Sequence, residues 1–186
     1  GSGEGKNALY CAERGAQVIA VEIARNAVET AIKSAQAKDR EIRVAQGTLK
    51  YKLGSIGEVF DIETGSIDIV LDVTSSNSLN EAERSVYLSE TTRILKKGGL
   101  FFVRALCKDG DTNAKQLVKD FSGGEKDTYT MPELGLTERV FTESDFREMY
   151  GAEFTILKLS KEFHYTRFQD RTYKRAFWVA YLRKEN

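Results

Sequence analysis

The chain begins with a glycine-rich stretch that limits what can follow it. Glycines occupy every second position of Gly1-Ser2-Gly3-Glu4-Gly5. Closely spaced glycines weaken both helices and strands, because they have no side chain to restrict the backbone or to pack. They suit a turn that brings bare backbone close to a ligand. The start of the chain therefore predicts a ligand-binding loop.

A predicted helix and a predicted buried strand follow this loop. Residues 7–14 place apolar side chains at helical spacing, and Gly15 ends that helix. Residues 17–23 are apolar and rich in β-branched side chains, as in a buried parallel strand, apart from Glu22 near its carboxyl end. In nucleotide-binding folds an acid at this position accepts hydrogen bonds from a ribose diol. The pattern predicts a nucleotide-type ligand.

The spacing of the glycines separates two families. The dinucleotide fingerprint requires glycine at the sixth position, where this chain has Lys6, so NAD-dependent oxidation is the disfavoured alternative. Glycine at the fifth position and an acid 17 residues after it resemble the first two motifs of class I S-adenosylmethionine-dependent methyltransferases. The resemblance implies S-adenosylmethionine as cofactor, with the ribose beside Glu22 and Ile23. It also implies close approach of the cofactor to Gly1, Ser2, Gly3 and Gly5.

The middle of the chain extends this resemblance to most of residues 1–106. A strand at 67–73 contains Asp72 near its carboxyl end, and a charged helix follows at about 80–95. Lys96-Lys97-Gly98-Gly99 would close that helix before an aromatic strand at 100–105. This order is similar to class I methyltransferases, most closely to small bacterial enzymes of the tellurite-resistance or thiopurine type.

The same resemblance assigns further cofactor contacts. It implies that Asp72, Val73 and Thr74 lie near the methionine end and that Ser55 and Ile56 lie around the adenine. The family more often has Gly-Asp where Gly54-Ser55 stand here, so a carboxylate contact to adenine is lost. Asp72 has an alternative role as a strand-end acid whose partner is a helix terminus.

One departure from the family pattern concerns the first strand. In the family a strand runs directly into the glycine loop, whereas Gly1 is the first residue of this sequence. The resemblance therefore implies that this strand is missing or is supplied from elsewhere. An open gap in the sheet would favour association between chains, and the oligomeric state is left open.

The expected fold is α/β: a doubly wound, Rossmann-like, mostly parallel sheet with an antiparallel C-terminal strand pair, in three α/β/α layers. Residues 41–45 are a short strand candidate, and residues 154–159 and 176–182 form the closing pair. Residues 107–140 are an excursion, either a lid on the substrate side or a surface loop. A single methyltransferase domain over residues 1–186 is expected.

Charge and cysteine content limit the class of partner. Lys plus Arg and Asp plus Glu number 28 each, so the net charge gives no electrostatic attraction of the whole protein to nucleic acid or to a membrane. The segment 158–184 is locally basic, with eight basic side chains against two acidic ones. Cys11 and Cys107 have no metal-like spacing, so no metal is expected and a reduced, cytoplasmic protein is the simplest interpretation.

Methyl transfer from a sulfonium requires that the protein position the two reactants and exclude water. A general base is needed only if the nucleophile arrives protonated. The catalytic residues are accordingly left unknown, with His164, Tyr165 and Arg104 as weak candidates. Each has an alternative, such as a packed histidine or a solvated hairpin turn. The candidates for binding an anionic group of the substrate are Arg104, Tyr165, Arg167, Arg171 and Tyr173.

The sequence thus predicts S-adenosylmethionine-dependent methyl transfer to a small-molecule acceptor by in-line displacement. Two alternatives stay open. The chain is an RNA or protein methyltransferase that docks through the basic 158–184 segment, or a truncated, non-catalytic binding domain with the same fold.

Overall fold

The computed structural model describes residues 1–168 and 171–185, which belong to two compact units, Gly1–Glu58 and Val59–Asn186. The first unit contains α1 (Lys6–Ala12), β1 (Gln17–Glu22), α2 (Arg25–Ala37), α3 (Asp39–Val44) and β2 (Thr48–Leu53). The second contains β3 (Ile67–Val73), the short 3₁₀ turn η1 (Ser76–Ser78), α4 (Glu81–Ile94), β4 (Leu95–Leu106), α5 (Thr112–Asp120), β5 (Thr128–Met131), β6 (Leu136–Arg139), α6 (Glu143–Gly151), β7 (Thr155–Phe168) and β8 (Arg171–Arg183).

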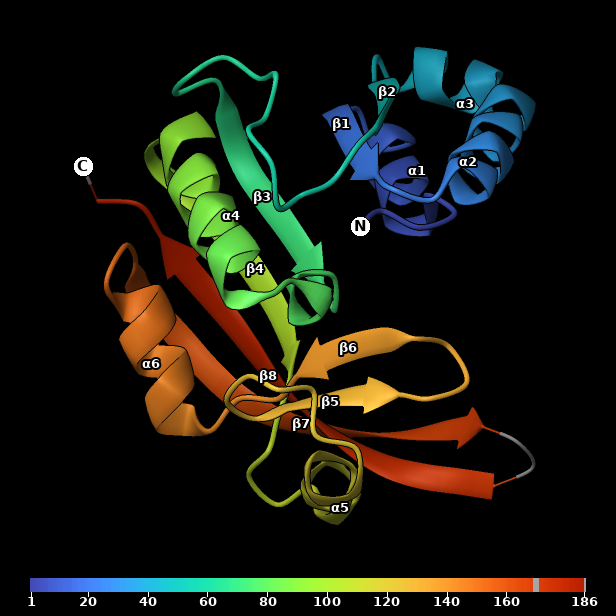
Figure 1. Ribbon diagram of the computed structural model, residues 1–186. Coiled ribbons are helices and arrows are strands. Elements are labelled where there is room, and N and C mark those ends of the chain that lie inside the picture. The colour runs from blue at the N-terminus through green and yellow to red at the C-terminus, as the bar shows by residue number, and fades with distance from the viewer. Residues whose placement is uncertain (169–170, 186) are drawn as a thin grey trace. The chain divides into compact units, whose positions relative to one another are not determined.

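The first unit is built on a parallel strand pair. β1 and β2 run side by side, with Gln17 opposite Thr48 and Glu22 opposite Leu53 (Figure 1). The helix and strand predicted after the glycine loop are confirmed as α1 and β1. The strand predicted at 41–45 is wrong, because these residues belong to α3 and its end. Asp39 and Arg43 pair one helical turn apart there, and Ile42 is buried.

The second unit contains a four-stranded mixed sheet in the order β3-β4-β8-β7. β3 and β4 are parallel, while β8 is antiparallel to both β4 and β7. Tyr87 of α4 and Tyr150 of α6 both contact the ring of Phe101 on β4, so the two helices cover the same face (Figure 1). The α/β class with parallel pairs and an antiparallel C-terminal pair is confirmed. Among the described strands, β1 and β3 each have a single partner.

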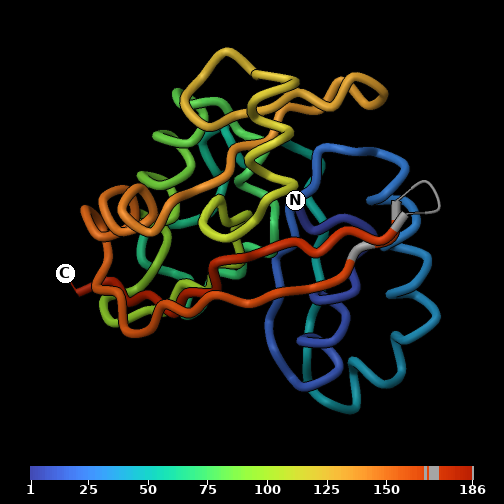
Figure 2. Tube along the Cα trace, turned by 90° about the horizontal axis from the view of Figure 1, so that it is seen from below, coloured from blue at the N-terminus to red at the C-terminus, as the bar shows by residue number. Residues whose placement is uncertain are grey.

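The C-terminal strands are longer than the sequence predicts. β7 and β8 pair from Thr155 opposite Arg183 to Phe168 opposite Arg171, and Figure 2 shows them running side by side. The stretch between the two predicted strands is therefore largely strand rather than connection. Its backbone polar groups are paired within the hairpin, so polar side chains do not prevent it from being extended.

The predicted excursion at 107–140 is an ordered layer made of α5 and the β5–β6 hairpin. Tyr129, Val140 and Ala114 pack with Leu106 and Phe177 of the large sheet. Asp111 reinforces this packing, since its carboxylate accepts hydrogen bonds from the N–H of Ala114 at 2.7 Å and from the N–H of Ala176 at 2.9 Å. Its Oδ2 also accepts a bond from Arg175 Nε at 3.1 Å. A lid function for this layer stays a prediction.

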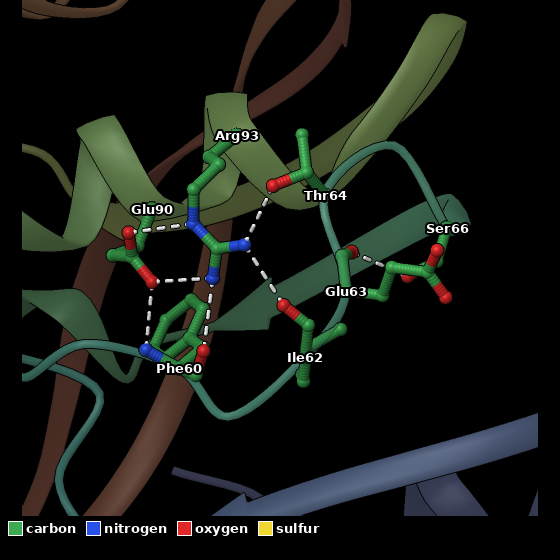
Figure 3. A network of polar contacts seen from close by, with 7 residues as sticks. All are labelled: Phe60, Ile62, Glu63, Thr64, Ser66, Glu90 and Arg93. Atoms are coloured by element: carbon green, nitrogen blue, oxygen red, sulfur yellow. Dashed lines mark hydrogen bonds and ion pairs between the residues drawn. The ribbon is translucent and has the colours of Figure 1, made fainter.

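Helix α4 fixes the segment that leads into β3. Glu90 and Arg93 project from its last turns, and the Arg93 guanidinium donates to the carbonyl oxygens of Phe60 and Ile62 at 2.9 and 2.8 Å (Figure 3). Glu90 accepts from the N–H of Phe60 at 2.7 Å and from Arg93 itself. The planar guanidinium of Arg93 and the carboxylate of Glu90 thus hold the backbone of residues 60–64 against α4.

The glycine pair after α4 does not close the helix as predicted. The helix ends at Ile94 and β4 starts at Leu95. Lys184, just after β8, bonds to the end of the helix, since its Nζ donates to Thr92 O in the last helical turn at 2.6 Å and to Leu95 O, just beyond the helix, at 2.8 Å. A residue far away in the sequence thus does what the Lys-Lys-Gly-Gly segment was expected to do.

Candidate functional site

The glycine loop is tied to β1 and turns tightly over it. The Ser2 N–H donates to Val21 O at 2.8 Å, and the Gly5 N–H donates to Ser2 O at 3.1 Å. Gly3 and Gly5 both have left-handed backbone, with φ of +54° and +78°. A Cβ on Gly5 would overlap Tyr51 Oη and come within 2.9 Å of Ala31 Cβ, whereas a Cβ on Gly3 would meet no atom within 4 Å. Gly5 is therefore required by packing, and Gly3 leaves space open beside bare backbone.

Glu22 connects this loop to the end of β1. Its Oε2 accepts a hydrogen bond from the Gly3 N–H at 2.7 Å, and its Oε1 accepts one from the Ala24 N–H at 2.9 Å. Burial raises the pKa of Glu22, but the bonds from Ala24 and Gly3 outweigh it and leave the pKa below the usual value. Each oxygen keeps capacity for another donor, such as a ligand hydroxyl.

We expect the Gly3 and Ala24 amide resonances to titrate together, with an apparent pKa below the ordinary glutamate value of 4.5. A carboxyl whose folded pKa is lowered stabilises the fold above its unfolded pKa and loses that contribution as pH falls through the folded pKa. The experiment is an NMR titration from neutral to acidic pH, and Glu22→Gln should remove the shared step. A midpoint at or above 4.5 would contradict the geometry.

Other predicted cofactor residues of the first unit lie at the same end of the strand pair. The Gly54 N–H donates to Glu22 O at 2.9 Å, which places the loop with Ser55 and Ile56 next to the end of β1. Ser55 Oγ accepts from the Gly57 N–H at 3.0 Å, so its side chain shapes its own loop. Ile23 is exposed and apolar at this edge, and Gly1 is exposed.

Two buried hydroxyls in the first unit have no hydrogen-bond partner, and this tests whether a polar ligand fits. They are Ser2 Oγ, in the glycine loop, and Tyr51 Oη, beside Gly5. Burying a hydroxyl without a partner costs about 1–3 kcal/mol, so a polar ligand here would recover free energy. The open space over Gly3, the fixed carboxylate and these hydroxyls fit a nucleoside. Tyr51 was missed from the sequence, because its place beside Gly5 depends on strand pairing.

In the second unit, Asp72 is a buried acid that organises the loop after β3. Its Oδ1 accepts from the N–H groups of Ser75 and Ser76 at 2.9 and 3.3 Å, and its Oδ2 accepts from Tyr87 Oη at 3.1 Å. The next residue but one, Thr74, has a left-handed φ of 56°. A β-branched residue in this region is strained, and such strain gathers at functional sites. Val73 lies between them at the end of the strand.

Arg104 and His164, two candidates on the substrate side, lie against the same ring. The Arg104 guanidinium stacks over Phe177 with its Cζ 3.5 Å from the ring centroid, and the His164 ring meets Phe177 edge-on at 5.8 Å. His164 Nε2 lies 3.4 Å from the Glu162 carboxylate. Burial lowers the pKa of Arg104, and the charge of Glu162 opposes this shift. The structure thus brings these two side chains together on one face of β4, β7 and β8.

The remaining substrate candidates do not converge. Tyr165 and Arg167 are exposed on β7, opposite Lys174 and Thr172. Tyr173 pairs with Thr166, so the pleat of the hairpin puts it on the other face. The Arg171 side chain lies outside the described part of the chain. The described side chains of Tyr165, Arg167 and Tyr173 therefore do not lie together around one anion.

The second unit also holds a cavity of about 350 Å³ between the start of α4 and the β5–β6 layer. It is lined by Ser78, Leu79, Asn80, Glu83, Gly123, Glu125, Gly135, Leu136 and Thr137. The sequence predicted an excursion here but not the cavity, since its walls come from two segments that are at least 40 residues apart in the sequence. Within residues 1–168 and 171–185, no group of three His, Cys, Asp or Glu side chains could hold a metal ion, and no helix is long and apolar enough to cross a membrane.

A family model described as a methyltransferase domain matches residues 1–103, more than half of the chain. The chain belongs to this methyltransferase family, which confirms the resemblance seen in the sequence and makes the protein an enzyme that transfers methyl groups. The family uses S-adenosylmethionine as methyl donor. No curated protein sequence matches the chain.

Several solved structures share the fold. A SAM-dependent methyltransferase from Methanosarcina mazei matches with a TM-score of 0.82 and 20% identity over 100% of this chain and 90% of that one. A 1,6-didemethyltoxoflavin-N1-methyltransferase from Burkholderia thailandensis, solved with S-adenosylhomocysteine, matches with 0.70 and 18% over 100% and 69%. TehB from Haemophilus influenzae matches with 0.71 and 15% over 100% and 56%. At these identities the likeness establishes the fold.

Proposed function

We propose that this chain transfers the methyl group of S-adenosylmethionine to a small-molecule acceptor by in-line displacement. The observation that carries the proposal is the glycine loop, where open space over Gly3 lies beside the fixed carboxylate of Glu22. When bound, the cofactor supplies a methyl carbon that is already activated by the sulfonium. The protein then has to position the acceptor and exclude water.

The proposed roles in cofactor binding follow from these positions. The backbone of Gly1, Ser2 and Gly3 is proposed to allow close approach, and Gly5 to permit the tight left-handed turn of the loop. Ser2 Oγ is a buried hydroxyl of that loop without a partner among the described residues. Glu22 accepts the ribose hydroxyls beside the apolar Ile23. Ser55 and Ile56 are proposed to lie around the adenine, and Asp72, Val73 and Thr74 to lie near the methionine end. Asp72 would act there by holding the strained loop in shape.

The 350 Å³ cavity supports a small acceptor, because small-molecule sites in proteins typically measure about 300–1,000 Å³. It is lined partly by the 107–140 layer, for which the sequence left open a lid on the substrate side or a surface loop. Arg104 and His164 around Phe177 stay candidates for contact with the acceptor. The free thiols of Cys11 and Cys107 suit a reducing compartment, and we place the protein in the cytoplasm.

The alternative of docking RNA or protein through residues 158–184 receives less support. Many of the basic side chains there have partners inside the protein. Arg175 pairs with Asp111, Lys184 binds helix carbonyls, and three lysines lie over aromatic rings, namely Lys158, Lys161 and Lys174. Arg175 and Lys184 are thus engaged within the protein, while the exposed Lys158, Lys161 and Lys174 keep their charge.

The proposal is tested by calorimetric and thermal-shift titration of the chain with S-adenosylhomocysteine, with NAD as the control. A ligand that binds only the folded state raises the apparent stability in proportion to its occupancy. We expect saturable binding of S-adenosylhomocysteine and no response to NAD. Binding of neither ligand would overturn the proposal, and binding without turnover on any acceptor would favour a non-catalytic domain.

A further inference from the structure

Two arginines are buried beside one another in the second unit, on opposite elements. Arg84 lies on α4 and is 2% exposed, and Arg139 lies at the end of β6 and is 8% exposed. Their guanidinium carbons lie 5.7 and 5.0 Å from the centroid of the same ring, Phe141. Two cations therefore share one apolar neighbour away from water.

Among the residues that the structure describes, no acid forms an ion pair with Arg84 or Arg139, although Glu125 and Glu81 act on Arg84 at longer range. Burial lowers the pKa of Arg84, and the charge of Arg139 lowers it further. Burying like charges together is unfavourable unless something of opposite sign compensates.

Several donors around this pair also lack acceptors. Arg84 uses one nitrogen, Nη2, for the carbonyl oxygens of Ser76 and Leu79. Within the described part of the chain, its Nε and Nη1 have no partner, and neither does Arg139 Nε. Each unpaired buried donor costs about 1–3 kcal/mol, which cation–π contact of about 0.5–2 kcal/mol offsets only in part.

A fourth unused donor lies in the η1 turn. The Asn77 side chain is 1% exposed, and its Nδ2 has no partner among the described residues. Its Oδ1 accepts from the Leu106 N–H at 3.2 Å, while Leu106 O accepts from the Phe141 N–H at 2.9 Å. The amide is thus held next to Phe141 with its donor end unused. An oxyanion would both accept hydrogen bonds from the unused donors and compensate the two positive charges.

We propose that Arg84, Arg139 and Asn77 form a binding site for an oxyanion, a carboxylate or phosphate, which is the anionic group of the methyl acceptor. The acceptor assignment rests on the proposed methyl transfer, but the binding of an oxyanion does not. The 350 Å³ cavity borders this site at Leu79, whose carbonyl oxygen Arg84 contacts, and at Thr137, which shares the face of β6 with Arg139. Because Arg84 is almost fully buried, entry requires the β5–β6 hairpin to move aside.

The test measures the Arg84 and Arg139 Nε–H resonances by NMR while the full chain is titrated with inorganic phosphate or acetate. Ionic strength is held constant with chloride, which separates binding from the general effect of salt on stability. We expect saturable shifts of both resonances and slower hydrogen exchange in residues 128–139. Preference for phosphate or for acetate then identifies the anionic group of the acceptor.

Variants decide between a ligand site and a purely structural pair. Arg139→Met should weaken oxyanion binding by about tenfold to a hundredfold, the loss expected for charged hydrogen bonds. Arg147→Met, which removes an exposed arginine of α6, should leave it unchanged. Asn77→Ala provides a second variant if Arg139→Met does not fold.

Shifts that do not saturate, or binding that survives both Arg139→Met and Asn77→Ala, would overturn the site and leave the donors to buried water. S-adenosylhomocysteine affinity is measured in parallel on the same variants. If the wild-type protein does not bind S-adenosylhomocysteine, the proposed function is wrong. The oxyanion site is tested separately, by the phosphate and acetate titrations.

Discussion

Gly3→Ala is expected to weaken S-adenosylhomocysteine binding by about a hundredfold while leaving the protein folded. The new Cβ would meet no protein atom within 4 Å, so it would occupy the open space that the ligand needs. Its cost to the fold is that of left-handed backbone, about 1–2 kcal/mol. Calorimetry gives the affinity, and urea unfolding gives the stability.

Gly5→Ala should behave in the opposite way. Its Cβ would overlap Tyr51 Oη and press on Ala31, so we expect the first unit to lose about 2–4 kcal/mol of stability through overpacking and strained backbone.

Gly65→Ala is the matched control for Gly3→Ala, because Gly65 also has a left-handed φ, +63°, and open space around it but lies outside the glycine loop. Equal loss of affinity in Gly65→Ala and Gly3→Ala would show that strain, rather than the ligand site, is responsible.

Asp72→Ala is expected to destabilise the second unit by about 3–5 kcal/mol. The substitution leaves the N–H groups of Ser75 and Ser76 and the Tyr87 hydroxyl without their acceptor in a buried place. Burial raises the pKa of Tyr87 well above normal, and the charge of Asp72 adds to this, so the phenol stays a donor. Urea unfolding measures the loss, and hydrogen exchange at Ser75 and Ser76 locates it.

Asp68→Ala is the control on the same strand. Asp68 is exposed and pairs with Lys96 at 2.7 Å, so its removal should change stability by no more than about 1 kcal/mol. Tyr87→Phe combined with Asp72→Ala completes a double-mutant cycle, in which we expect the two effects to be coupled. Additive changes in the free energy of unfolding would mean that the Tyr87 hydroxyl stabilises the fold independently of the Asp72 carboxylate.

Much of the first unit could be predicted from the sequence because its signals are local. A glycine triplet, a short amphipathic helix and an apolar strand ending in Glu22 are contiguous, and each has a conformational reason that does not depend on distant residues. The strand at 67–73 is of the same kind.

Helix α4 shows where local pattern was insufficient. Its apolar spacing predicts a core face with Ala82, Val86, Leu88, Thr92 and Leu95; Leu88 and Leu95 are buried, but Ala82 and Val86 are exposed. The buried face also carries Arg84, Tyr87 and Glu90. The Tyr87 hydroxyl and the Glu90 carboxylate bond to Asp72 and to the Phe60 N–H, whereas Arg84, within the described residues, donates through Nη2 alone. A sequence pattern counts polar residues as outward-facing unless their partners are known.

The sequence by itself determined the family, the glycine loop and the acid that holds it, since these depend on backbone conformations that only particular residues adopt. The tertiary structure alone decided which charged groups lie inside. Arg84 and Arg139 are 55 residues apart, and their burial around Phe141 follows from the docking of the β5–β6 layer against α4 and η1. Burial and charge compensation are properties of neighbours in space, and no local pattern encodes them.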